Sequence, residues 1–167
     1  MDIGSGSGHW IDFYKSLGSF RTIGIDVSLS SFNYLKDKYS NQPDISILHG
    51  KAFDLLSQFD GSFSVVNAIG VMFHIVSDSE LIDTINKIAS VLKRDGLFIV
   101  SGQFGYLNGL NVQIDRNGHI NKRLRSKKHW KKALINAGFS KVQFYFNNAY
   151  LWINDTLPEN NVLVATK

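Results

Sequence analysis

The chain has 167 residues, of which 44% are hydrophobic, and this is enough for one domain with a buried core. It has no cysteine, which excludes disulfides and thiolate metal sites and fits a reducing, cytoplasmic environment. The net charge is a modest +4, the longest nearly apolar run (residues 65–76) is too short to span a bilayer, and the first residues do not resemble a signal peptide. We therefore expect a single cytoplasmic domain over residues 1–167 with no membrane contact.

A loop with glycine at alternate positions opens the chain, in the run from Asp2 to Gly8. Glycine lets the backbone turn sharply and approach a ligand closely, because it has no Cβ. The helix expected from Trp10 offers unpaired amides and a partial positive charge to a carboxylate or phosphate. A dinucleotide fingerprint would need a glycine where His9 stands, so an NAD(P)-dependent oxidoreductase is the less favoured interpretation.

An acidic residue ends the next apolar segment, residues 22–26, which we predict to be a strand. Asp26 follows Gly8 by 18 residues, near the spacing at which a nucleoside-binding βαβ unit places its ribose-reading carboxylate. A carboxylate can accept hydrogen bonds from both ribose hydroxyls. The alternative is a helix cap or a solvated loop acid, although Ser28 already offers a cap for the next helix.

Helical and strand-like patterns alternate along the rest of the chain. Ser77 begins a capping box, and Gly96 is expected to end the helix behind it. This order predicts a doubly wound α/β sheet. The expected helices cover residues 10–17, 29–39, 78–92 and 126–137, and the expected strands cover 22–26, 45–48, 63–69, 97–100, 142–146 and 162–166.

Residues 104–125 form an insertion before the last helix, and we predict a β-hairpin within it. Its strands are residues 112–115 and 119–121, joined through a turn that contains Asn117-Gly118.

Four segments follow one another in an order that is typical of a single protein family, although the sequence of each segment alone is too variable to identify it. Residues 2–8 form the glycine loop, 63–74 an apolar strand that leads to a histidine, 92–99 a turn into a strand, and 130–139 a helix ending in Ala-Gly-Phe. Together they resemble the class I S-adenosylmethionine-dependent methyltransferases. The resemblance implies a mostly parallel, seven-stranded Rossmann-like sheet in the order 3-2-1-4-5-7-6, with an antiparallel last strand and a truncated first strand.

The same resemblance implies S-adenosylmethionine as the cofactor and a set of residues that bind it. One position departs from the family, because Lys51 stands where an acid usually reads the adenine amino group. The adenine would therefore have to be bound by the backbone of Lys51 and Ala52. The implied residues are Asp2, Gly4, Ser5, Gly6 and Gly8 at the methionine end, Asp26 at the ribose, Val27, Lys51, Ala52 and Phe53 around the adenine, and Ile69 and Gly70 on the far side.

Methyl transfer requires a nucleophile held in line at about 3 Å, and a hydroxyl acceptor benefits from a general base. Of the five histidines, His74 is best placed for this role, just past the fourth strand. The alternative is a structural histidine that bonds to the start of the following helix. We find no spacing of His, Asp or Glu that suggests a metal site.

The acceptor is predicted less directly. Methyltransferases often build the acceptor pocket from insertions beyond the strand ends, which makes Tyr106, Asn108 and Asn111 candidates, while a surface hairpin without a catalytic role is the alternative. Seven cations within residues 122–132 would suit RNA phosphates or simply a solvated helix start. The segment lacks regular aromatic interleaving, and no Asn/Asp-Pro-Pro-Tyr run follows the fourth strand. We therefore expect a small-molecule acceptor, with an RNA-modifying methyltransferase as the alternative.

Only Met1 precedes Asp2, so the first strand is expected to be short. Because that strand is central in the fold, its neighbours would be left with unpaired backbone groups. A misplaced start or a gene fragment is our expectation here, and a truncated, non-catalytic remnant is a further alternative.

Overall fold

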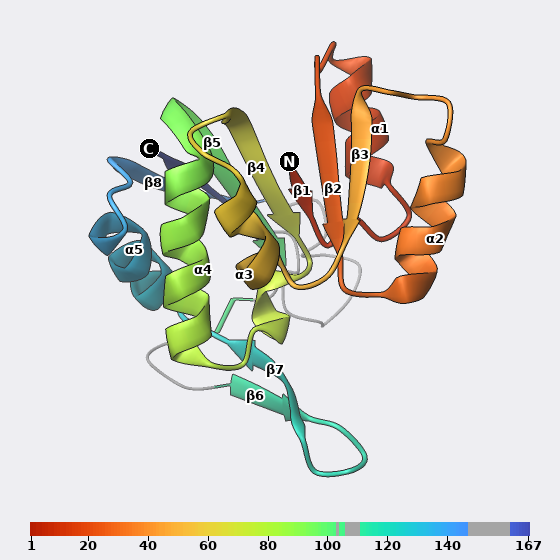
Figure 1. The fold of residues 1–167 in the computed structure, drawn as a ribbon. Coiled ribbons are helices and arrows are strands. Elements are labelled where there is room, and N and C mark those ends of the chain that lie inside the picture. Colours follow the sequence, from red (N-terminus) through yellow and green to blue (C-terminus); the bar gives the residue numbers. More distant parts are fainter. Residues whose placement is uncertain (103, 106–110, 147–160) are drawn as a thin grey trace.

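The computed structural model describes residues 1–102, 104–105, 111–146 and 161–167, and its centre is a seven-stranded sheet (Figure 1). The strand order is β3-β2-β1-β4-β5-β9-β8, which confirms the predicted order once the two hairpin strands are counted. The first five strands are parallel, and β9 is antiparallel to both of its neighbours. The strands are β1 (Asp2–Ile3), β2 (Thr22–Asp26), β3 (Ile45–His49), β4 (Phe63–Ile69), β5 (Leu92–Gly102), β8 (Lys141–Phe146) and β9 (Asn161–Thr166).

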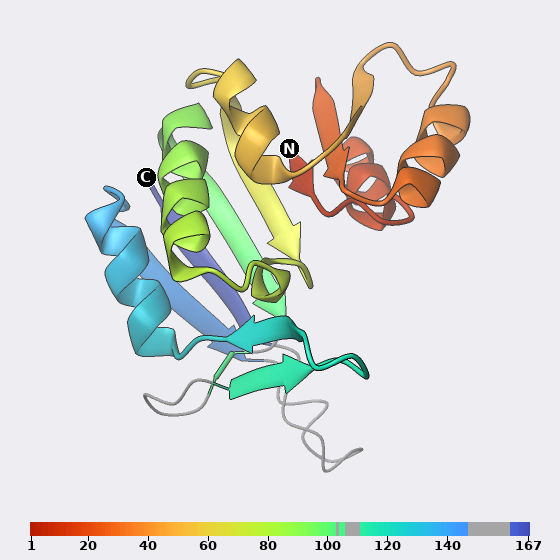
Figure 2. The same ribbon diagram turned by 60° about the horizontal axis from the view of Figure 1, so that its bottom comes forward.

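Helices cover both faces of this sheet (Figures 1 and 2). One group, α1 and α2, packs with β3 around a buried cluster that includes Ile11, Leu35 and Tyr39. The larger cluster lies on the other face, under α4 and α5. The helices are α1 (His9–Ser16), α2 (Leu29–Lys38), α3 (Ala52–Leu55), α4 (Asp78–Val91) and α5 (Lys127–Asn136), with 3₁₀ turns η1 (Leu56–Gln58) and η2 (Met72–His74).

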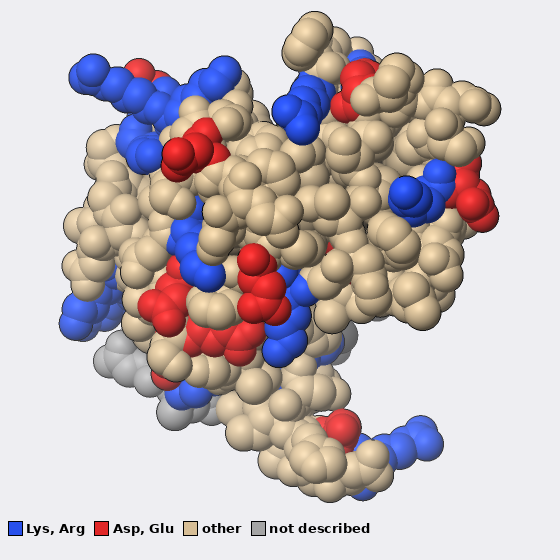
Figure 3. Space-filling model, viewed as in Figure 1, with Lys and Arg blue, Asp and Glu red and all other residues tan. Residues whose placement is uncertain are grey.

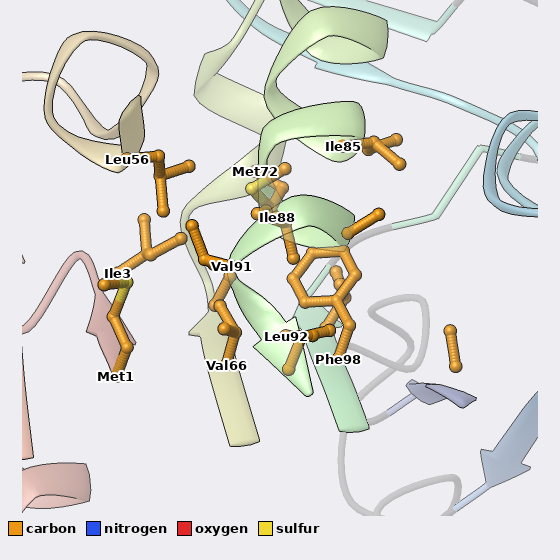
Figure 4. Close-up of a cluster of buried hydrophobic side chains, with 14 of the residues drawn as sticks. Met1, Ile3, Leu56, Val66, Met72, Ile85, Ile88, Val91, Leu92 and Phe98 are labelled. Carbon is orange, nitrogen blue, oxygen red and sulfur yellow. The ribbon is translucent and has the colours of Figure 1, made fainter. Parts of the chain in front are cut away.

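The larger cluster forms the main core (Figure 4). Ile85 and Ile88 of α4 and Phe98 of β5 are fully buried, and their apolar surface is the principal source of stability. No helix within the described residues is long and apolar enough to cross a membrane.

Serine side chains set the start of three helices. Ser28, Ser77 and Ser126 each accept a hydrogen bond at Oγ from the amide three residues later, at 3.4, 3.3 and 3.3 Å. These bonds satisfy amides that have no partner within the helix, which is why the sequence signal for all three starts is confirmed.

The end of α4 differs from the prediction. The helix ends at Val91, and Gly96 lies inside β5 instead of ending the helix. Asp95 has a positive φ of 60°, so the turn from helix into strand depends on this acidic residue as well as on Gly96. The short helix α3 and the turn η1 were not predicted from the sequence.

The first strand is short, as expected. The Met1 amino group donates to the Val65 carbonyl at 2.8 Å, and the Met1 carbonyl accepts from the Asn67 amide at 2.9 Å. Beyond Met1, a groove of about 380 Å³ lies between the N-terminal ends of β2 and β4, and its lining includes Leu17 and Phe20.

The predicted hairpin is present as β6 (Asn111–Ile114) and β7 (Ile120–Leu124). In its turn, the Asp115 side chain accepts from the amides of Asn117 and His119 at 2.8 and 2.9 Å. Figure 2 shows the hairpin beside η2, below the strand ends. Of the predicted pocket residues, Tyr106 and Asn108 lie outside the described residues, and Asn111 begins β6.

Candidate active site and cofactor site

The glycine loop joins β1 to α1 and turns back over β2. The amides of Gly4 and Ser5 both donate to the Ile25 carbonyl, at 2.7 and 3.2 Å. Gly4 has φ 73°, and a Cβ on it would lie 2.7 Å from Val71 Cγ2. A larger residue would be strained and would also clash, so the loop can lie against the 71–76 segment only with glycine at this position.

Asp26 lies at the carboxyl end of β2 and faces the glycine loop. Its Oδ2 accepts from the Gly6 amide at 2.7 Å, and its Oδ1 accepts from the Ser28 amide at 2.8 Å. Ser28, not Asp26, caps α2. Each carboxylate oxygen can accept a further hydrogen bond, so Asp26 is available to two ligand hydroxyls.

Asp2 is a buried carboxylate with one partner missing. Its Oδ1 accepts from Asn67 Nδ2 at 2.8 Å, whereas its buried Oδ2 has no hydrogen-bond partner among the described residues. Burial raises the pKa of Asp2 to about 6, although the bond from Asn67 opposes this. Burial and the charge of Asp2 together raise the pKa of the nearby Tyr14 to about 12. An unpaired buried carboxylate oxygen fits a cationic ligand group.

A cavity of about 490 Å³ lies at the carboxyl ends of the strands, a volume typical of small-molecule sites. Four predicted residues do not line it: Asp2 and Ser5 are buried, Gly6 bonds to Asp26, and Gly8 packs on α2. Nine predicted residues do line it: Gly4, Asp26, Val27, Lys51, Ala52, Phe53, Ile69, Gly70 and His74.

The segment predicted to hold adenine borders this cavity through α3. Lys51 is the N-cap residue of α3, and its side chain makes no capping hydrogen bond. Lys87 Nζ donates to the Phe53 carbonyl at 2.8 Å and lies 3.6 Å from the centroid of the Phe53 ring. This contact from α4 fixes Phe53 at the cavity wall.

His74 ends the η2 turn and lies on the cavity wall. Its Nδ1 lies 3.0 Å from the carbonyl oxygen of Asn121 in β7. A carbonyl can only accept, so Nδ1 carries a proton, and in the neutral ring Nε2 is then the acceptor. The partner of His74 is therefore the hairpin, whereas the structural alternative placed this partner at the start of α4.

Apart from His74, the segment from Val71 to Val76 is a part of the site that the sequence prediction missed. Its apolar side chains line the cavity, and arginines from the hairpin side hold its backbone. Arg125 Nη1 donates to the Ile75 carbonyl at 2.8 Å, and Arg123 Nη1 to the Val76 carbonyl at 3.0 Å. The available signal was its position directly after a parallel strand, where crevice-lining loops occur.

Both arginines also pair with Asp78 at the start of α4, each at 2.7 Å. Burial alone would raise the pKa of Asp78, but the hydrogen bond and charge of Arg125 hold it below its ordinary value. Two of the seven cations in the basic segment are thus occupied inside the protein. The Lys122 ammonium lies 5.0 Å from the centroid of the Phe73 ring.

The remaining lysines of the segment lie on or near α5. On the face drawn in Figure 3, Lys and Arg side chains form separate groups interspersed with Asp and Glu.

Among the described residues, no three His, Asp or Glu side chains gather where they could hold a metal ion.

The sheet is mostly parallel, with a glycine loop after β1, an acid at the end of β2 and a crevice at the strand ends. Together with the family match, these features define a class I S-adenosylmethionine-dependent methyltransferase, and S-adenosylmethionine is its cofactor. The chain belongs to the methyltransferase domain family, whose model matches residues 1–96. That match includes the glycine loop, Asp26 and His74.

Solved structures share the fold over nearly the whole chain. An S-adenosylmethionine-dependent methyltransferase of Archaeoglobus fulgidus has a TM-score of 0.76 and 18% identity, covering 99% of this chain and 84% of the other. One from Mesorhizobium loti has a TM-score of 0.74 and 15% identity, covering 99% and 89%. A Listeria monocytogenes protein assigned to the same enzymes has a TM-score of 0.77 and 18% identity, covering 99% and 88%. No curated protein matches the sequence.

Proposed function

We propose that this methyltransferase acts as a single domain over residues 1–167 and transfers the methyl group to a small-molecule acceptor, with His74 as the general base. The observation that carries the proposal is the bond from His74 Nδ1 to the Asn121 carbonyl at the cavity wall. In the neutral ring, this bond leaves Nε2 as the acceptor on a residue that lines the cavity.

The residues of the site fit the cofactor. The first amides of α1 receive the carboxylate of the methionine end, and Asp2, buried next to the glycine loop with one unpaired oxygen, supplies a negative charge near its ammonium group. Asp26 accepts from the ribose hydroxyls. Gly4, Ser5, Gly6 and Gly8 shape the loop, Val27, Ala52, Phe53 and the backbone of Lys51 surround the adenine, and Ile69 and Gly70 line the far side.

When bound, S-adenosylmethionine supplies a methyl group that is already activated by its positive sulfur. The protein's task is then to hold the acceptor in line and to take its proton. His74 Nε2 takes the proton of an acceptor hydroxyl, and the hairpin keeps the ring oriented during the transfer.

The basic segment supports a small-molecule acceptor over RNA. Arg123 and Arg125 hold the 71–76 segment and Asp78, so these two charges are not free to neutralise phosphates. RNA modification remains the second candidate, because Lys128, Lys131 and Lys132 are exposed on α5.

The test is incorporation of label from methyl-labelled S-adenosylmethionine into a low-mass metabolite fraction and, in parallel, into total RNA. We expect label in the low-mass fraction, lowered about 100-fold or more in His74→Asn, because a positioned base contributes on this scale. His119→Asn is the matched control, since that histidine is exposed in the hairpin turn. Label in RNA that disappears with added salt would favour the second candidate.

A further inference from the structure

The C-terminal end of α2 braces the glycine loop from the side opposite the cavity. Lys38 Nζ lies 3.1 Å from the carbonyl oxygen of Ser7. The Tyr39 hydroxyl lies 3.1 Å from the carbonyl oxygen of Gly8 and 2.7 Å from Asp12 Oδ1. Lys38 Nζ also donates to Asp12 Oδ2 at 2.7 Å. Lys38, the last residue of α2, and its C-cap residue Tyr39 thus meet two successive loop carbonyls, and the single hydroxyl proton of Tyr39 is shared between Gly8 and Asp12.

The contact between α2 and the loop is close. Gly8 has φ 82°, and a Cβ on it would lie 2.4 Å from the Tyr39 hydroxyl and 2.8 Å from Leu35 Cδ2. Tyr39 itself is only 4% exposed. The position of the loop is therefore set by the end of α2 as well as by β2.

The network keeps its charges near neutral pH. Burial, reinforced by Asp12, raises the pKa of Tyr39 to about 12. The bond to Asp12 raises the pKa of Lys38. Partial burial opposes the effect, but the bonds from Lys38 and Tyr39 hold the pKa of Asp12 below its ordinary value. The tyrosine thus stays a donor and the lysine stays a cation.

Fixing these carbonyls also fixes the amides that follow them. A peptide group is planar, so the direction of the Gly8 carbonyl sets the direction of the His9 amide. His9 is the first residue of α1, where an amide has no partner within the helix and can bind an anion.

We propose that Lys38 and Tyr39 are positioning residues for the amino-acid half of the cofactor, acting through the carbonyls of Ser7 and Gly8. The inference rests on the proposed function, which assigns the glycine loop to that half. The Lys38–Asp12 ion pair is partly exposed, so it adds little to global stability and its removal leaves a folded protein.

The experiment compares two ligands by calorimetric titration of the full chain. S-adenosylhomocysteine has the amino-acid half, and methylthioadenosine lacks it. For Tyr39→Phe and Lys38→Met we expect S-adenosylhomocysteine to bind about 3- to 10-fold more weakly, as is typical for one lost hydrogen bond. Methylthioadenosine is expected to bind within about 2-fold of the wild-type affinity, because its contacts lie elsewhere.

Lys36→Met is the matched control, because Lys36 lies on the same helix with its ammonium 5.9 Å from the Phe32 ring centroid. Lys38→Arg should restore most of the affinity. Equal losses for both ligands would indicate a merely structural role, and unchanged affinities would also overturn the inference. Wild-type protein that binds neither ligand would instead overturn the cofactor assignment on which the inference rests.

Discussion

Asp2 combines a buried carboxylate with an unpaired oxygen, and we predict from this that cofactor affinity depends on pH. The pKa of Asp2 is raised to about 6 by burial. If the charge of Asp2 attracts the ligand ammonium, only the ionised form binds well. We expect the affinity for S-adenosylhomocysteine to rise about tenfold from about pH 5 to pH 7, a range in which the ligand's own groups hardly titrate.

Asp2→Asn should bind weakly at every pH and show no such rise. Asp37→Asn, an exposed change on α2, should keep the wild-type profile. A wild-type affinity that is flat across this range would show that the charge of Asp2 does not contribute to binding.

The same carboxylate has the opposite effect on folding. Because its pKa is higher in the folded state, the folded protein binds the extra proton between about pH 4 and 6, and the free energy of unfolding falls as pH rises through this range. Asp2→Asn removes this contribution, on the order of 3 kcal/mol at full ionisation. Denaturant titrations of both proteins at several pH values measure the difference.

At the scale of elements, Arg125 ties the hairpin side of the molecule to the segment that carries His74. It is 3% exposed and bonds to both Ile75 and Asp78. Arg125→Met keeps the aliphatic contacts but removes both bonds, so we expect the free energy of unfolding to fall by about 1–3 kcal/mol. Methyl transfer should fall more than cofactor affinity, because the acceptor side loosens first.

Urea titrations and initial rates check this, with Arg116→Met in the exposed hairpin turn as the control. An Arg125→Met protein as stable and active as the wild type would mean that the arginine does not fix the segment.

Local signals predicted most of the elements for physical reasons. A serine before an amphipathic run is itself the group that satisfies the first free amides, so the starts at Ser28, Ser77 and Ser126 could be read directly. The end of α4 could not. Asp95 takes the left-handed conformation expected of Gly96, and only packing against β4 and β9 decides that the chain becomes a strand there.

For the molecule as a whole, the cavity wall formed by the loops after β1 and β2 could be predicted from the sequence, whereas the wall formed by residues 71–76 could be predicted only at His74. Asp26 and the glycine loop are local motifs whose spacing follows from one βαβ unit. The segment from Val71 to Val76 lines the cavity through its position after β4 and through arginines about 50 residues later, and such long-range contacts leave no local pattern.

Ligand binding should therefore stabilise the entire domain and not one element. A ligand at about a hundred times its dissociation constant adds roughly 2.7 kcal/mol to the free energy of unfolding. For a domain of this size, that raises the melting temperature by roughly 5–10 °C. We expect this shift with S-adenosylhomocysteine and none with reduced nicotinamide dinucleotide, measured by thermal denaturation.

Asp26→Asn should lose most of the shift, because an amide in place of the carboxylate presents a donor to the Gly6 or Ser28 amide and weakens the ribose site. A full shift in that variant would separate Asp26 from cofactor binding and leave the glycine loop as the principal anchor.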